Sequence, residues 1–228
     1  HNYSARINAE YEGLLEFSTD GRNPAGGGYL PRFRNLLKQE TDFKRGYAAG
    51  FSARRAVNRD ASGVGETLKE NLAKAPLGNW QVGSHMMGET IPKEENFVSL
   101  SKDKKDAWGV PLLNISVDYD ENDLLMKKDY IEQLSEMFTE AGFKNIKVND
   151  SSQAPGLDIH EMGGARMGHD PKTSILNKWN QVHACNNVFV TDGACMTSTS
   201  TQNPSLTYMA LTARAVDYAV KTINRFDI

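Results

Sequence analysis

The sequence predicts an α+β protein in which an antiparallel sheet with flanking helices is followed by a strand-loop-helix segment. Short stretches of alternating apolar and polar residues recur through the first half of the chain, which is typical of half-buried strands. No long helix separates these stretches, and this favours antiparallel pairing with one covered face. Near residue 150 the composition shifts to glycine, methionine, serine and threonine. We therefore expect a sheet region over 1–150 and a second region over 151–228.

The strands are expected where the alternation is clearest. The first, at 3–11, places Ala5, Ile7 and Ala9 on one side. Further strands are predicted at 47–53, 80–86, 97–100 and 113–119. The stretch Gly21–Gly28 contains a proline and three consecutive glycines and is predicted to be a loop. A second loop leads into a short helix over Glu66–Lys74.

From Asn122 the apolar period becomes helical. The predicted buried face of this helix contains Leu124, Ile131, Leu134, Phe138 and Ala141. Gly142 supplies the stop, and a short strand is expected over Asn145–Val148.

The end of the chain is predicted to run from a strand at Asn187–Thr191 through a loop of small residues at Asp192–Gln202 into a final helix. Asn203 is a good N-cap, and Pro204 suits the first helical position because its missing N–H is not needed there. The apolar stripe of this helix is expected to be buried; it consists of Leu206, Met209, Ala210, Ala213, Val216, Val220 and Ile223.

Composition excludes several classes of protein. The 228 residues carry a net charge of −3 and form no basic face, so we expect no nucleic-acid partner. The longest apolar stretches, such as Val110–Val117, are too short to cross a bilayer, and we expect a soluble chain without a membrane segment. Cys185 and Cys195 lack CxxC spacing and are interpreted as buried thiols. The chain opens on His1, as though it continued from a longer one.

The start of the last helix is a candidate binding site. Its open N–H groups and the positive end of its dipole can receive an anion or an electron-rich ligand edge. An Asn-Pro pair alone indicates no more than a capped surface helix. The run Thr197–Thr201, which consists of serine and threonine, favours a loop that surrounds a ligand.

His160 is the second candidate, since it lies in the glycine-rich stretch Asp158–Gly168 and can titrate near neutral pH. It is either a general base or a hydrogen-bonded structural residue. A zinc-protease motif is excluded because Gly164 stands where HExxH needs its second histidine. His169 and Asp170 are weak candidates for metal ligands, and we expect no metal. His85 and His183 have no partner pattern and are assigned structural roles, as is His1.

Three separated blocks, Asp158–Gly168, Asn187–Ala194 and Asn203–Arg214, resemble the C-terminal signature of the glucose-methanol-choline (GMC) oxidoreductase family in order and spacing. Weaker matches lie upstream, at Gly88–Pro92 and Asp106–Pro111. The resemblance covers most of residues 80–228.

The resemblance implies a catalytic pair, since the two catalytic positions of the family match His160 and Asn203. A His/Asn pair is similar to that of pyranose and cholesterol oxidases. His160 would take the hydroxyl proton of an alcohol while hydride passes to FAD, and Asn203 would hydrogen-bond the same oxygen. The resemblance also implies flavin-contacting positions, which are Asp192, Gly193, Asn203, Pro204, Ser205 and Thr207.

The sequence departs from the family in one respect: it has no GxGxxG strand-turn-helix for the ADP moiety. We therefore interpret it as the C-terminal part of an FAD-dependent enzyme, with the rest of the FAD-binding domain in a missing N-terminal part. Alone it is expected to bind FAD weakly or not at all and to be inactive. The expected substrate is an alcohol, either a sugar or a polyol, and the compartment, cytoplasmic or exported, depends on the missing part. The alternative is a non-catalytic module that binds carbohydrate or protein and retains the family motifs.

Overall fold

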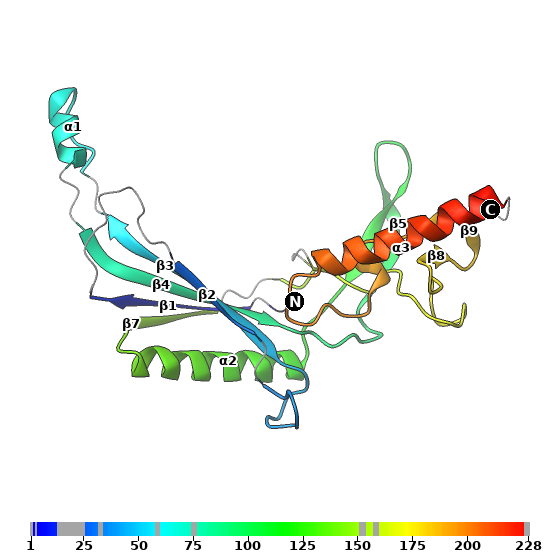
Figure 1. Ribbon diagram of the computed structural model, residues 1–228, viewed down its shortest axis with the longest axis horizontal. Helices are drawn as coiled ribbons and strands as arrows, with labels where there is room; N and C mark the ends of the chain where they lie inside the picture. Colours follow the sequence, from blue (N-terminus) through cyan, green and yellow to red (C-terminus); the bar gives the residue numbers. More distant parts are fainter. Residues whose placement is uncertain are drawn as a thin grey trace.

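The computed structural model describes residues 2, 4–12, 26–31, 34–57, 60–73, 77–150, 154–156 and 160–225. Figure 1 shows an antiparallel sheet with a long helix along one face, followed by a C-terminal region that ends in a second long helix. The predicted α+β class is confirmed. The division of the chain at residue 150 stays a prediction.

The sheet has five strands in the order β2-β3-β4-β1-β7, and every pairing within it is antiparallel. Its strands are β1 (Ala5–Tyr11), β2 (Gly26–Leu30), β3 (Tyr47–Val57), β4 (Leu77–Gly88) and β7 (Lys144–Asp150). Four of them, β1, β3, β4 and β7, lie where strands were predicted. β1 shows the reason most clearly, because Ala5, Ile7 and Ala9 are buried while Arg6 and Asn8 are exposed.

The fifth strand, β2, corrects the sequence prediction. Gly26, Gly27 and Gly28 were predicted to lie in a loop, whereas they open an edge strand that pairs with β3 along its whole length. A Cβ atom on Gly27 would lie 2.9 Å from the carbonyl oxygen of Phe51, so the close approach of the two strands requires glycine there. Backbone pairing therefore outweighs the low strand propensity of glycine. The first part of the predicted loop, 21–25, lies outside the described residues.

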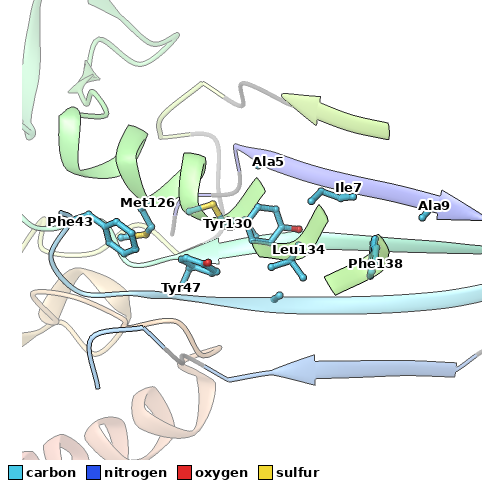
Figure 2. Packing of buried hydrophobic residues seen from close by; sticks show 11 residues of the cluster. Ala5, Ile7, Ala9, Phe43, Tyr47, Met126, Tyr130, Leu134 and Phe138 are labelled. Carbon is cyan, nitrogen blue, oxygen red and sulfur yellow. The ribbon is translucent and has the colours of Figure 1, made fainter. Parts of the chain in front are cut away.

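Helix α2 (Glu121–Glu140) covers one face of the sheet. Asp120 caps it, since its side chain accepts a hydrogen bond of 3.2 Å from the backbone N–H of Asp123. The predicted stop is confirmed, because Gly142 adopts a φ of +81° just after the helix. The core between helix and sheet is shown in Figure 2 and contains Ala5, Ile7, Ala9, Phe43, Tyr47, Ala49, Met86, Met126, Tyr130, Leu134 and Phe138.

The predicted buried face of α2 is partly wrong. Leu134 and Phe138 are buried as expected, but Leu124 is 56% exposed. Met126 and Tyr130 take the remaining core positions. Burial of Tyr130 is tolerated because its hydroxyl donates a 2.9 Å hydrogen bond to Ser84 on β4. The other two predicted positions, Ile131 and Ala141, are half-buried and exposed.

Two further elements lie outside the five-stranded sheet. The predicted short helix is confirmed as α1 (Glu66–Ala73), which projects at the far end of β3 and β4 (Figure 1). Strands β5 (Phe97–Lys105) and β6 (Pro111–Ser116) were expected in the main sheet but form a separate hairpin. Their short connection favours pairing with each other, and the Asp106 side chain fixes the turn by accepting from Trp108 and Val110 N–H groups, both at 2.9 Å.

The C-terminal region contains β8 (Gln181–Val182), β9 (Cys185–Phe189), the short 3₁₀ helix η1 (Gly193–Cys195) and α3 (Ser205–Asn224). The predicted strand is present but begins two residues earlier than expected, at Cys185. The predicted cap is wrong: Pro204 occupies the N-cap position of α3, and no side chain caps the helix. Cys195 is buried as expected, whereas Cys185 is exposed.

The predicted burial of α3 is also wrong within this chain. Only Ala215 and Thr222 of the helix are buried, whereas its large apolar side chains are exposed by half or more; these are Leu206, Met209, Val216, Val220 and Ile223. A different side of the helix packs on the chain, where Tyr218 stacks on Trp179 with 4.8 Å between the ring centroids. We refer to the exposed residues as the α3 apolar stripe. Among the described residues, no helix is long and apolar enough to span a membrane.

Leu134 and Leu124 of α2 were both expected in the core, but only Leu134 is buried there. We expect Leu134→Ala to lower the free energy of unfolding by about 2–5 kcal/mol because it leaves a cavity at a side chain that is 1% exposed. Leu124→Ala, on the exposed side of the same helix, should change it by less than about 0.5 kcal/mol. Urea unfolding of both variants measures the difference, and equal losses would contradict the observed helix orientation.

Candidate functional site

A pocket of about 610 Å³ lies between the sheet and the C-terminal region. Strands β2, β3 and β4 form one wall, and residues on either side of η1 form the other. The pocket brings together His160 and Asn203, the two residues predicted to act as a pair, although they are distant in the sequence. Its lining consists of Gly28, Tyr29, Gly50, Phe51, His85, Met87, His160, Gln202 and Asn203.

His160 is 8% exposed and opens a segment that runs beside η1. Backbone hydrogen bonds fix this segment, since the Ala165 N–H donates to the Ala194 carbonyl at 2.9 Å and the Met167 N–H to the Cys195 carbonyl at 3.1 Å. Such bonds hold the backbone that follows His160 in one position relative to η1. An imidazole at the edge of a pocket on a fixed backbone is suited to proton transfer.

Gly193 and Asp192 shape this segment from outside the pocket. Gly193 is buried, and a Cβ atom there would lie 2.8 Å from the carbonyl oxygen of Glu161. Only glycine at this position therefore allows η1 to lie so close to the segment that follows His160. The carboxylate of Asp192 accepts a 3.0 Å hydrogen bond from the Ala194 N–H and caps η1. Neither residue lines the pocket that holds His160.

The start of α3 forms the edge of the pocket next to Asn203. Asn203 is exposed, and its side chain makes no hydrogen bond to another described residue. Pro204 is buried behind it, whereas Ser205 and Thr207 are exposed on the first turn. Because no side chain caps the helix, its first N–H groups remain available to a ligand. This end of α3 therefore fits the electron-rich edge of a ring such as the isoalloxazine of FAD.

Two hydrogen bonds join the sheet to the loop that precedes α3. The hydroxyl of Ser198 donates to a carboxylate oxygen of Glu89 at 2.7 Å, and the hydroxyl of Tyr29 donates to the carbonyl of Thr201 at 3.0 Å. Glu89 is 5% exposed, and Arg45 lies 3.8 Å from the same carboxylate. A buried carboxylate paired in this way strongly favours one position of the loop. Asn203 follows that loop directly.

Sequence reasoning missed both of these contacts. Glu89 lies in Gly88–Pro92, where a weak match was noted, and Tyr29 directly follows the predicted loop, but no periodicity identifies a partner more than 100 residues away. It also missed His85, which lines the pocket although a structural role was expected. Burial lowers the pKa of His85, and the positive charge of Arg6 lowers it further. A neutral imidazole is therefore the dominant form near pH 7.

The remaining histidines are consistent with structural or surface positions. His183 Nε2 lies 3.2 Å from the hydroxyl of Ser174 and 3.3 Å from the carbonyl of Gly168, inside the C-terminal region. His169 is exposed. Within the part of the chain that the structure describes, no group of three or more His, Cys, Asp or Glu side chains is arranged to hold a metal ion.

An antiparallel sheet thus faces a glycine-rich histidine segment and an uncapped helix start across one pocket, an arrangement suited to binding a small molecule. Residues 92–212 match the family model described as GMC oxidoreductase. The chain belongs to this family, and the resemblance seen in the sequence is confirmed.

Characterised relatives include dehydrogenases and an oxidase. The chain is 33% identical to 2-methyl-1,2-propanediol dehydrogenase of Mycolicibacterium austroafricanum, over 78% of this chain and 34% of that protein. It is 31% identical to the fructose dehydrogenase large subunit of Gluconobacter japonicus, over 85% and 36%. It is 34% identical to paromamine 6'-oxidase of Streptomyces fradiae, over 68% and 29%. The chain thus spans about a third of the length of these relatives.

Among solved structures, the chain is similar to pyridoxine 4-oxidase from Mesorbium loti, with a TM-score of 0.47 and 13% identity. The similarity covers 97% of this chain and 42% of that structure.

The contact between Glu89 and Ser198 should be measurable as a coupling energy. In a double-mutant cycle of Glu89→Ala and Ser198→Ala, we expect the loss of unfolding free energy in the double mutant to differ from the sum of the two single losses by about 0.5–3 kcal/mol. The reason is that the two side chains share one hydrogen bond. The matched pair Glu89→Ala and Thr197→Ala should be additive, since Thr197 is the exposed neighbour of Ser198. Additivity in both cycles would show that Glu89 does not hold the loop.

Proposed function

We propose that the chain is the C-terminal part of an FAD-dependent enzyme that oxidises the CH–OH group of a sugar or polyol. The observation that carries the proposal is the convergence of His160 and Asn203 on one pocket. Membership of the GMC oxidoreductase family supports the reaction class. The names of the relatives support the substrate class, because they refer to a diol, fructose and paromamine.

His160 acts as the general base in the proposed reaction. Its imidazole accepts the proton of the substrate hydroxyl, and the carboxamide of Asn203 donates a hydrogen bond to the same oxygen, which fixes the oxygen as its proton leaves. This is the His/Asn pairing expected from the sequence. Bound FAD supplies the acceptor for the hydride of the adjacent C–H bond. The sheet wall, with Met87, limits the access of water to the reacting carbon.

The flavin is proposed to lie at the start of α3. The residues that would hold it are Asp192, Gly193, Asn203, Pro204, Ser205 and Thr207. The uncapped N-terminus of the helix supports this position, since its dipole stabilises negative charge on a reduced ring. Ser205 and Thr207 are exposed on the first turn and can contact a ring there.

A missing N-terminal part of the same protein is proposed to complete the FAD site. The relatives are about three times as long as the matched region. The α3 apolar stripe supports a partner surface, because five large apolar side chains along one helix are unfavourable in water. We propose that the N-terminal part covers this stripe and supplies the binding site for the ADP moiety.

Replacing His160 in the full-length protein tests the catalytic assignment. We expect His160→Ala to retain FAD but to slow reduction of the flavin by substrate by about two to four orders of magnitude, because the general base is lost. Stopped-flow absorbance of the flavin under anaerobic conditions measures this rate. His169→Ala is the matched control, since this histidine is exposed and outside the pocket. Unchanged reduction in His160→Ala would remove this residue from the mechanism and favour the non-catalytic binding module.

Flavin content tests the proposed division of the FAD site. The 228-residue chain purified alone should carry little or no FAD, while the full-length protein should carry about one FAD per chain. Absorbance near the flavin bands, compared with protein concentration, measures the ratio. A stoichiometric flavin spectrum from the short chain would show that it holds FAD without an N-terminal part.

A further inference from the structure

His85 lies in a row of residues that crosses four of the five strands of the sheet. Tyr29 on β2 pairs with Gly50 on β3, Gly50 pairs with His85 on β4, and His85 pairs with Arg6 on β1. Residues directly opposite one another on neighbouring strands project to the same face. These four positions therefore share one face of the sheet.

That face is the one opposite α2. The two neighbours of His85 along β4 are directed toward the helix, because Ser84 accepts a hydrogen bond from Tyr130 of α2 and Met86 belongs to the buried core. Successive side chains of a strand alternate between faces, so His85 projects to the opposite side. On that side it lines the pocket together with His160 and Asn203.

Gly50 provides the space that the imidazole of His85 occupies. A Cβ atom on Gly50 would lie 2.6 Å from Nε2 of His85, so the ring lies directly above the glycine. Glycine inside a strand lowers stability and is not otherwise required at this position, where the backbone is extended. Because Gly50 has no side chain, the imidazole of His85 can extend from β4 across β3 toward Tyr29 on β2.

We propose that His85 is a substrate-positioning residue that hydrogen-bonds a second hydroxyl group of the substrate while the reacting hydroxyl lies at His160 and Asn203. This inference rests on the proposed function and narrows its substrate class. It makes the enzyme selective for compounds with two or more hydroxyl groups over alcohols with one.

The chemistry of the pocket wall supports this role. The sheet contributes two polar side chains to the pocket, Tyr29 and His85, beside Gly28, Gly50, Phe51 and Met87. The hydroxyl hydrogen of Tyr29 is donated to the carbonyl of Thr201. A neutral imidazole has one donor and one acceptor nitrogen, and a hydroxyl group can serve as the partner of either. The depressed pKa of His85 keeps the ring in that form near neutral pH.

The test uses the full-length enzyme and substrate pairs that differ by one hydroxyl group, such as 1,2-propanediol with 1-propanol, or a hexose with its deoxy analogues. His85→Phe keeps a ring above Gly50 but removes both hydrogen-bonding nitrogens. We expect kcat/KM for the more hydroxylated member to fall roughly 10-fold, mainly through KM, and kcat/KM for the other member to change less than about 2-fold. His85→Gln, which restores a donor and an acceptor, should recover most of the loss.

Gly50→Ala gives an independent test that leaves the imidazole in the chain. The added methyl group displaces the ring, so the variant should show the same selective loss as His85→Phe. Gly26→Ala is the matched control in the same sheet, because a Cβ atom there meets nothing within 4 Å. It should keep the preference of the unmodified enzyme.

Two results would overturn the inference. One is an equal loss for both members of each pair in His85→Phe, which would assign His85 a structural role. The other is an unchanged kcat/KM for both members in His85→Phe, which would remove His85 from substrate binding. Failure of the proposed function has a different signature, since the full-length protein with bound FAD would then oxidise no compound of either kind.

Discussion

The packing of α2 against one face of the five-stranded sheet is the interaction on which the site depends. Ile7, Met86 and Leu134 are nearly inaccessible to solvent within this layer, so the register of β1, β3 and β4 is fixed by what must face the helix. Because side chains alternate, the same register decides what faces the other way. His85 reaches the pocket for the same reason that Met86 reaches the core.

The pocket has two walls, and a small number of hydrogen bonds holds them together. The bonds from Ser198 to Glu89 and from Tyr29 to Thr201 connect the sheet to the loop before α3. A salt bridge in water contributes little, but a carboxylate that is 5% exposed must keep its partners or bear the full desolvation penalty. The loop is therefore held where Asn203 meets the pocket, although Asn203 itself is exposed.

Elements that depend on a local pattern could be predicted from the sequence, whereas elements whose structure depends on long-range contacts could not. Strand β1 and the stop at Gly142 follow from alternation and from a glycine with positive φ. Strand β2 could not be predicted, because its glycines form a strand only through pairing with β3. His160 and Asn203 were identified by motif, whereas His85 has no motif, and its position depends on the pairing of β4 with Gly50. The predicted burial of the α3 apolar stripe was wrong for another reason. An apolar stripe on a helix indicates a surface that something covers, but no other part of the described chain covers this one.

In the proposed function, the division of the pocket between two walls separates reaction from recognition. His160 and Asn203 lie on the C-terminal segment beside η1 and α3, where the helix N-terminus also lies. The sheet wall consists of glycine, aromatic, methionine and histidine residues on strands that belong to a different layer. Under this proposal, a different residue at His85 or a side chain at Gly50 would alter what the pocket binds without moving the proposed base, His160. The proposed chemistry can thus remain the same while the substrate changes, because the two tasks rest on elements that are fixed by different contacts.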